Sequence, residues 1–508
     1  MPSPDALSAS KKNRTAILLS LTQGNVSCRV FVAIVAALLL LSLESRGQTA
    51  TPPGAGRGDA QDNELRDLRE AVRELQVQVA DLRRELHDQR ALNAQQPAAA
   101  GLAPVTQANN AQPQASEVHE NTAQAKQESI ASSLDFLRRT DIEVGIDTYY
   151  GYNFNDPIGR VNLLRAYDVS SNAFSLNQAN VILKQDPDPS AGRRFGARLD
   201  LQFGQATETL QGNPGNEPRP DVYRNIFQAY GTYVFPAGNG LTLDVGKFAS
   251  SLGYETNYSK DQFNYSRSYW FDFLPFYHMG ARVNYKFNDA VALNYWVVNG
   301  TQQTEPFNGF KDQFVGLLLT PTKTVNWNVN YYLGQEHPDV VFFSNGGAPP
   351  NSPTLQGLPF QPIPNAPNGR LHIFDTYITW QSTPKLAFVL EGDYVIERLL
   401  KESVPSTVWG GAAYVQYRFN PKSDLAVRGE YLADQGGLYS GKTEALKEIT
   451  ATYGYKLISG LLVQTEFRRD FSNQPVFLTD ALGILSKHQD TATVGLIWWW
   501  GNRKTETW

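Results

Sequence analysis

The chain has 508 residues, a formal net charge of −5, 12% aromatic residues and a mean hydropathy of −0.38. This hydropathy argues against a bundle of membrane-spanning helices, but a transmembrane barrel also looks hydrophilic because half of each strand faces water. The mild negative charge gives no sign of nucleic-acid binding. Cys28 is the single cysteine, which excludes internal disulfides and multi-cysteine metal sites, and we expect neither a metal ion nor a cofactor.

Residues 1–47 have the features of a signal peptide. They contain RVFVAIVAALLLLSL, a mostly apolar run with the length of a signal-peptide core, and several Lys and Arg residues precede it. Ser45–Gly47 offers a small-x-small cleavage site, so we expect a mature chain that begins near Gln48. An uncleaved anchor is the alternative, although the run is short for a membrane-spanning helix. In both cases the chain is exported.

Residues 62–92 carry a heptad pattern between two linkers. Apolar residues recur there at alternating spacings of three and four, among Arg, Glu, Asp and Gln. The apolar seam consists of Leu65, Leu68, Val72, Leu75, Val79, Leu82 and Leu86. We expect a short coiled-coil helix that associates with other copies of itself, a single solvated helix being the alternative. Residues 48–61 form a short linker, and residues 93–139, rich in Ala, Gln and Pro, form a disordered one.

The stretch TDIEVGIDTYYGYNFN, residues 140–155, alternates between apolar and polar residues. Ile142 and Ile146 fall on one parity, whereas Glu143 and Asp147 fall on the other. A period of two is typical of a strand that has one face in an apolar medium. Both a soluble sandwich and a transmembrane barrel contain such strands, and this stretch alone leaves both open.

The same period recurs to the end of the chain, so residues 140–508 predict a barrel of about sixteen strands. The predicted spans are 140–155, 174–186, 193–205, 222–236, 240–248, 278–288, 290–302, 311–321, 325–335, 370–381, 385–397, 408–419, 424–434, 446–458, 461–471 and 490–500. Short connections rich in turn residues alternate with long ones, such as residues 249–277 and 336–369. This alternation is typical of an all-β, antiparallel transmembrane barrel with short periplasmic turns, and a soluble sandwich gives no reason for it.

Aromatic residues near the predicted strand ends give an independent indication of a barrel. If odd-numbered strands run outward, these residues form two belts at the membrane interfaces. One belt consists of Tyr233, Phe235, Tyr285, Phe287, Trp380, Tyr417, Phe419, Trp498 and Trp500, and the other of Tyr150, Tyr152, Phe203, Tyr331, Tyr394, Tyr431 and Phe467. The sequence therefore predicts that the apolar face meets lipid and that the polar face lines a lumen.

Many charged residues lie on the parity that is predicted to face the lumen. They are Arg198, Asp200, Arg282, Lys286, Glu391, Asp393, Arg418, Arg428, Glu430, Lys456, Glu466, Arg468 and Asp470. A barrel of this width leaves a water-filled channel, in which opposed charges filter solutes. The alternative is that these residues pair across adjacent strands, for example Arg428 and Glu430 with Arg418.

The third long loop, ASSLGYETNYSKDQFNYSRSYWFDFLPFY, spans residues 249–277. It is too apolar and aromatic for a loop that moves freely in water, so we expect it to fold into the barrel and narrow the pore. Its charged candidates at the constriction are Glu255, Lys260, Asp261, Arg267 and Asp272. Packing over a neighbouring subunit or over the barrel rim is the alternative.

The same region carries a family resemblance. The motifs LDVGKFASSLGYE, NYSRS, LPFYHMGARVNYKFND and WVVNG resemble the OmpL-like family of beta-barrel porins, and AFSLNQANVIL and FRRDFSNQPVF resemble two of its strand motifs. The resemblance covers most of residues 140–500 and implies an outer-membrane porin of a Gram-negative-type bacterium. It implies no particular solute and no binding residues. The heptad segment and the tail GNRKTETW lie outside it, which leaves open whether Trp508 or the aromatic cluster before the tail is the assembly signal.

Two classes of function remain after enzymes are set aside. The scattered histidines show no Ser-His-Asp arrangement and no metal spacing, so we expect no enzymatic activity. The first class is a porin for passive diffusion of small hydrophilic solutes, and the second is a structural anchor tethered to the periplasm or cell wall through the coiled coil. The expected partners are outer-membrane lipid, the outer-membrane assembly machinery and further copies of the chain, with a trimer favoured.

Overall fold

The computed structural model describes residues 138–211, 217, 220–342 and 360–501. The predicted signal peptide, the first linker, the second linker up to residue 137, the heptad seam at 65–86 and the terminal Trp508 lie outside these residues. Among the described residues, no helix combines the length and the apolar character needed to cross a membrane.

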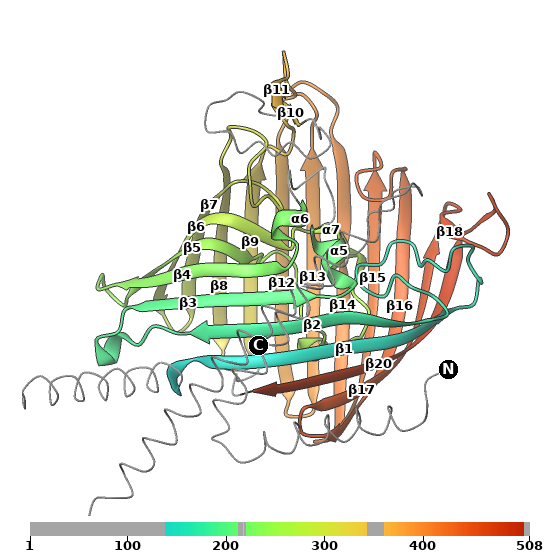
Figure 1. The fold of residues 1–508 in the computed structure, drawn as a ribbon, viewed down its shortest axis with the longest axis horizontal. Helices are drawn as coiled ribbons and strands as arrows, with labels where there is room; N and C mark the ends of the chain where they lie inside the picture. Colours follow the sequence, from blue (N-terminus) through green and yellow to red (C-terminus); the bar gives the residue numbers. More distant parts are fainter. Residues whose placement is uncertain (1–137, 212–216, 218–219, 343–359, 502–508) are drawn as a thin grey trace, which may run out of the picture. The chain divides into compact units, whose positions relative to one another are not determined.

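Sixteen antiparallel strands close into one barrel, in which neighbours along the chain are neighbours in the wall and β20 pairs with β1 (Figure 1). The strands are β1 (Asp141–Asn153), β2 (Ala173–Gln185), β3 (Phe195–Phe203), β4 (Ile226–Phe235), β5 (Leu241–Ala249), β6 (Tyr277–Asn288), β7 (Val291–Val298), β8 (Asp312–Thr322), β9 (Val325–Gly334), β12 (Leu371–Thr383), β13 (Leu386–Glu397), β14 (Ser406–Asn420), β15 (Ser423–Gln435), β16 (Glu444–Ile458), β17 (Leu461–Ser472) and β20 (His488–Gly501). Each corresponds to one of the sixteen predicted spans. The predicted barrel is therefore confirmed, with strand ends shifted by a few residues.

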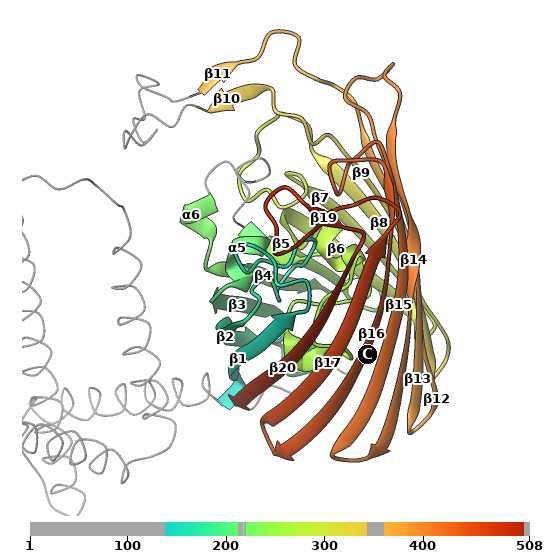
Figure 2. The same ribbon diagram turned by 90° about the vertical axis from the view of Figure 1, so that its right-hand side faces the viewer.

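The connections between strands hold the remaining elements. Two small hairpins, β10 (Val340–Phe342) with β11 (Phe360–Pro362) and β18 (Phe477–Leu478) with β19 (Leu485–Ser486), lie in long connections. Figure 2 shows β10 and β11 beyond the end of the wall strands. The short helices are η1 (Pro189–Ala191), α5 (Ala206–Gln211), α6 (Pro220–Tyr223), η2 (Ser259–Asp261) and α7 (Tyr269–Phe273).

Alternation along β1 sorts its side chains as the period of two predicts. Glu143 and Asp147 are buried inside, whereas Ile142 and Ile146, on the opposite parity, are half-exposed. In β2 the alternation slips by one residue, because Asn177 is an extra residue opposite β1 and forms a bulge. Its side-chain amide donates to Asp147 Oδ2 at 2.6 Å, so the bulge turns an additional polar group inward.

The outer face of the barrel is apolar and carries exposed aromatic side chains near the strand ends. They include Phe154, Phe235, Phe287, Trp380, Tyr394, Phe419, Phe467 and Trp500. Neighbouring rings touch, as in the Tyr285–Phe287 and Tyr417–Phe419 pairs, with centroids 4.9 and 5.2 Å apart. A soluble protein rarely exposes so continuous an apolar surface, whereas a barrel in lipid requires it.

The inner face is less polar than the alternation predicts. Between β7 and β16 it carries a buried apolar patch that includes Trp296, Val298, Phe314, Tyr332, Ile373, Tyr377, Val389, Val395, Val408, Tyr414, Leu432 and Leu446. The segment between β5 and β6 contributes Leu252, Tyr254, Trp270 and Leu274 to the same cluster. The inner wall is apolar there because it packs against this segment instead of facing water.

Candidate functional site

The segment between β5 and β6, residues 250–276, is held in a defined conformation by local bonds. Ser268 caps α7, since its hydroxyl accepts a hydrogen bond from the Phe271 backbone N–H at 2.9 Å. Gly253 has a φ of 80°, in the left-handed region that favours glycine. Tyr269 and Trp270 are completely buried. The segment is thus an ordered part of the interior.

Hydrogen bonds join this segment to strands on both sides of the ring. The Tyr258 hydroxyl donates to Asp200 of β3, and the Tyr254 backbone N–H donates to Glu391 of β13 at 3.0 Å. Because β3 is third and β13 eleventh in the ring of sixteen, these two partners lie eight strands apart, on opposite walls. Further bonds reach β17, where Glu466 accepts from the Tyr265 and Ser266 N–H groups at 2.7 and 3.0 Å.

All five charged candidates of the segment have charged or hydroxyl partners, Arg267 through a 3.4 Å bond to the Ser259 hydroxyl. Glu255 pairs with Arg428 at 2.8 Å, and Lys260 pairs with Glu143 at 2.7 Å and with Asp261 at 3.6 Å. Asp272 is half-buried and accepts a hydrogen bond from the Tyr439 hydroxyl at 2.9 Å. Burial raises the pKa of the Asp272 carboxyl to about 6, against the lowering effect of that hydrogen bond.

Arg267, the fifth candidate, binds backbone instead of facing a channel. Its guanidinium donates to the carbonyl oxygens of Thr256, Tyr265 and Asn257 at 2.9–3.1 Å. It is 1% exposed and lies over the Tyr167 ring. These contacts close the segment on itself, so the role of Arg267 is positioning.

Several lumen-facing charges form a buried network on β15, β16 and β17. Arg428 pairs with Glu448 at 2.7 Å, and Arg468 pairs with Asp470 at 2.7 Å and lies 3.6 Å from Glu448 and 3.8 Å from Glu430. All these side chains have no exposed surface. Arg418, the pairing partner considered for Arg428 and Glu430, instead lies at the turn end of β14.

The remaining wall charges pair locally or face the segment. Arg198 pairs with Asp200 at 3.0 Å, Arg282 with Asp244 at 2.7 Å, and the exposed Lys286 with Asp289 at 2.8 Å. Glu391 and Asp393 lie beside Asp375, and the carboxylate oxygens of these three residues lie within 4.8 Å of one another. Among the residues that the structure describes, this triplet is the group that could hold a metal ion.

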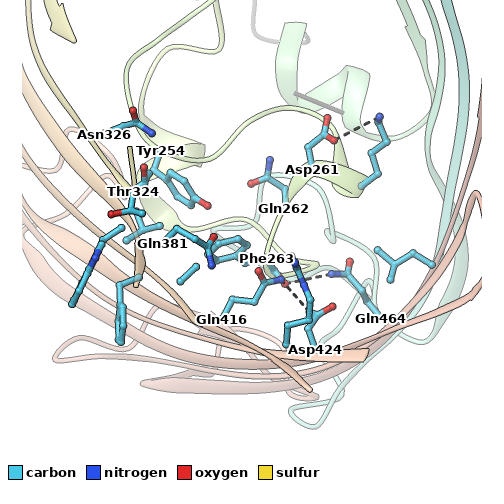
Figure 3. Close-up of a pocket in the computed structure, with 18 of the residues that line it drawn as sticks. Tyr254, Asp261, Gln262, Phe263, Thr324, Asn326, Gln381, Gln416, Asp424 and Gln464 are labelled. Carbon is cyan, nitrogen blue, oxygen red and sulfur yellow. Dashed lines mark hydrogen bonds and ion pairs between the residues drawn. The ribbon is translucent and has the colours of Figure 1, made fainter. Parts of the chain in front are cut away.

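A polar cavity of ≈310 Å³ lies between the segment and the turn ends of the strands (Figure 3). Gln262 and Phe263 of the segment face it, opposite Gln416 and Gln464 of the wall. Its charged lining residues are Lys260, Asp261, Lys323, Arg418, Asp424 and Lys456. Arg418 and Lys456 are exposed to this space, in contrast to the buried arginines of the network.

Sequence reasoning did not single out several residues that complete these clusters. Glu448 and Asp375 belong to predicted strands, and the period of two could have placed both inward. Arg165, which bonds Asp470 at 2.6 Å, belongs to the connection after β1, where no periodicity applies.

Several solved structures match the chain at very low sequence identity. OmpT of Vibrio cholerae is 10% identical, with a TM-score of 0.42, over 71% of this chain and 97% of that chain. The anion-selective porin from Comamonas acidovorans is 7% identical, with a TM-score of 0.45, over 71% and 99%. OprB of Pseudomonas putida is 12% identical, with a TM-score of 0.45, over 73% and 96%.

No curated protein matches the chain. The family model described as "Putative beta-barrel porin-2, OmpL-like" matches residues 140–498, which is more than half of the chain and includes nearly all of the barrel. The resemblance stated from the sequence motifs is thereby confirmed. The closed sixteen-stranded wall and its apolar outer face agree with this match. The chain belongs to the OmpL-like beta-barrel porin family and is an outer-membrane porin of a Gram-negative bacterium.

Proposed function

We propose that the chain is a passive diffusion channel for small hydrophilic solutes and that residues 250–276 form its constriction. The observation that carries this proposal is the pair of bonds from the segment to opposite walls, Tyr258 to Asp200 and Tyr254 to Glu391. A segment anchored at both ends of a diameter divides the interior into narrower paths. The solute must then pass beside it, along walls that carry charge.

The charges around the polar cavity favour small anions. Four cationic side chains and two carboxylates line it. Lys260 is partly neutralised by Glu143, whereas Arg418 and Lys456 are exposed to the cavity on the wall opposite the segment. An excess of positive charge in a narrow aqueous path raises the local concentration of anions.

Single-channel conductance of the refolded barrel in a planar bilayer, under a salt gradient, tests the proposal. A stable open current with a reversal potential of the sign for anions is expected. Folding is checked separately by heat-modifiable gel mobility. A reversal potential of the opposite sign would contradict the proposed anion preference but not the proposed channel. Absence of current from folded protein would contradict the channel itself.

The second candidate is a structural anchor, and the extent of interior packing favours it. Arg428, Arg468 and the apolar patch are buried between wall and segment, as in a protein core. In this function the predicted coiled coil at 62–92 reaches into the periplasm toward the cell wall, and the barrel holds it in the membrane. Folded protein without current would support this function. Export by the signal peptide at 1–47 and assembly as a trimer remain predictions under both functions.

A further inference from the structure

Three carboxylates lie together on the inner wall where the constriction segment begins. Asp375 of β12 is directly opposite Asp393 of β13, and Glu391 lies two residues before Asp393 on the same face. Their oxygens lie within 4.8 Å of one another. The side chains are 3%, 5% and 7% exposed for Asp375, Asp393 and Glu391 respectively, so water does not screen their mutual repulsion.

Asp393 has no hydrogen-bond donor near either carboxylate oxygen, among the residues that the structure describes. Each carboxylate oxygen of its two neighbours accepts one hydrogen bond, but only from neutral donors: Asp375 from the Gly253 N–H at 3.1 Å and from Asn330 at 2.6 Å, and Glu391 from the Tyr254 N–H at 3.0 Å and the Tyr414 hydroxyl at 3.4 Å. Within the described ranges, no Lys or Arg forms an ion pair with any of the three carboxylates. A buried carboxylate without a counter-charge is costly, and the adjacent Arg428 network shows how this wall otherwise compensates.

The donor set determines which counter-charge fits. All ligand atoms are carboxylate oxygens, with no His or Cys among them, which is the preference of hard divalent cations and not of zinc or copper. Calcium binds oxygens at 2.3–2.6 Å, so two oxygens on opposite sides of the ion are about 4.8 Å apart. Magnesium keeps several waters in a strict octahedron and has less use for a buried, carboxylate-rich site.

We propose that Asp375, Glu391 and Asp393 bind a calcium ion that ties the first turn of the constriction segment to the barrel wall. The single cysteine and the scattered histidines led us to expect no metal site. The three carboxylates are dispersed over two strands and become a cluster only through strand register. Two of the three ligands already hold the backbone N–H groups of Gly253 and Tyr254. A cation that neutralises these carboxylates therefore fixes the start of the segment and stiffens the constriction. This binding site is additional to solute passage.

Terbium luminescence on refolded, lipopolysaccharide-free barrel tests the site directly. Terbium replaces calcium and is sensitised by nearby tyrosines, and Tyr254 lies 6.2 Å from Tyr377 and 5.0 Å from Tyr414 between ring centroids. The Tyr414 hydroxyl also bonds Glu391, at 3.4 Å. We expect a saturable signal with one site per chain, displaced by calcium. A folded barrel that gives no saturable signal would overturn the proposal.

Asp393→Asn is the diagnostic variant, and Asp424→Asn is its control. Both remove one inward carboxylate from the wall, but Asp424 lies at the turn end of β15, accepts a hydrogen bond from Gln416 and lies outside the triplet. We expect at least a tenfold loss of terbium affinity in the first and unchanged affinity in the second. Equal affinity in both variants would place the metal elsewhere and contradict the proposal.

The wild-type chain gives a second readout, which does not depend on whether Asp393→Asn folds. Calcium should raise the midpoint of heat unfolding in detergent relative to excess EDTA, and magnesium at the same concentration should raise it less. If instead the carboxylates share a proton, the midpoint is insensitive to calcium and rises on acidification. That result would overturn the proposed calcium site. It would not bear on the channel proposal, which the conductance measurement tests separately.

Discussion

Two arginines on β15 and β17 illustrate how the contribution of a charge to stability depends on its position in this barrel. Arg428 on β15 has no exposed surface and bonds Glu255, Glu448 and the Ser266 carbonyl at 2.7–2.8 Å. Arg469 on β17 faces outward, is 48% exposed, and pairs with Asp490 at 3.3 Å. Removing the first leaves the buried Glu255 without its ion-pair partner and Glu448 with only the more distant Arg468, whereas water and lipid headgroups compensate for loss of the second.

Arg428→Met is therefore expected to lower the free energy of unfolding by about 3–5 kcal/mol, because Glu448 and Glu255 stay buried. Arg469→Met, the matched control, should change it by less than about 1 kcal/mol. Urea unfolding in micelles, followed by tryptophan fluorescence, measures both. Equal effects of the two substitutions would contradict the structural role assigned to the buried network.

Asp272 gives the stability of the constriction segment a pH dependence. Its pKa is raised from the ordinary 3.8 to about 6, chiefly by burial, while Tyr439, Arg468 and Arg165 act to lower it and Asp168 raises it further. The folded chain then takes up this proton at a higher pH than the unfolded chain. The contribution of Asp272 to stability therefore grows as pH falls from about 6 to 3.8, and is absent at pH 7.

Comparison of the wild type with Asp272→Asn isolates this contribution. The wild type should gain in urea midpoint relative to the variant as the pH is lowered from 7 to 4.5. Asp289→Asn is a control of opposite sign, because the hydrogen bond and charge of Lys286 lower the pKa of the exposed Asp289 carboxyl. A difference between wild type and Asp272→Asn that stays constant with pH would exclude Asp272 as the titrating group.

At the scale of elements, the strands were predictable and the packing of the interior was not. A period of two predicts β1 and its neighbouring strands because the outer face of the wall is largely apolar. The bulge at Asn177 breaks that period, and no local residue pattern announces it. The apolar inner patch around Trp296 and Phe314 was also missed, because VALNYWVV of β7 is apolar on both parities. Apolar residues on both parities of a barrel strand indicate that another part of the chain packs against the inner face of the wall.

The proposed constriction can be tested at two of the segment's side chains that line the cavity, Gln262 and Phe263. Gln262→Ala combined with Phe263→Ala removes side-chain volume beside the ≈310 Å³ space and keeps the backbone bonds that hold the segment. We expect a larger single-channel conductance than in the wild type. Leu482→Ala with Ile484→Ala, in an exposed connection, is the volume-matched control and should leave the conductance unchanged. A conductance unaffected by the first pair would exclude this part of the segment as the constriction.

At the scale of the whole molecule, the charges of the inner face divide into two groups. One group, which includes Arg428 and Arg468, is buried and paired, and it serves the architecture. The other group, which includes Arg418 and Lys456, lines the polar cavity, where we propose that it acts on the passing solute. The sequence placed both groups on the inner face, but it could not separate them, because the separation depends on which wall positions the segment covers.

Selectivity should follow the second group alone. Arg418→Gln with Lys456→Gln removes two positive charges from the cavity, so the reversal potential in a salt gradient should move toward cation preference. The control double variant, Lys447→Gln with Arg469→Gln, removes two positive charges from the outer face of β16 and β17. It should leave the reversal potential unchanged. Equal shifts in the two double variants would mean that net charge, and not the cavity lining, sets the selectivity.

The bonds from the segment to opposite walls also impose an order on assembly. Each wall strand finds its partner within the next stretch of chain, except for the closing pair of β1 and β20. The segment's partners on β13 and β17 instead follow it by 137 and 201 residues. The segment therefore cannot complete its contacts until the later strands are in place and the sheet has curled. The wall therefore forms first, and residues 250–276, the proposed constriction, complete their contacts last.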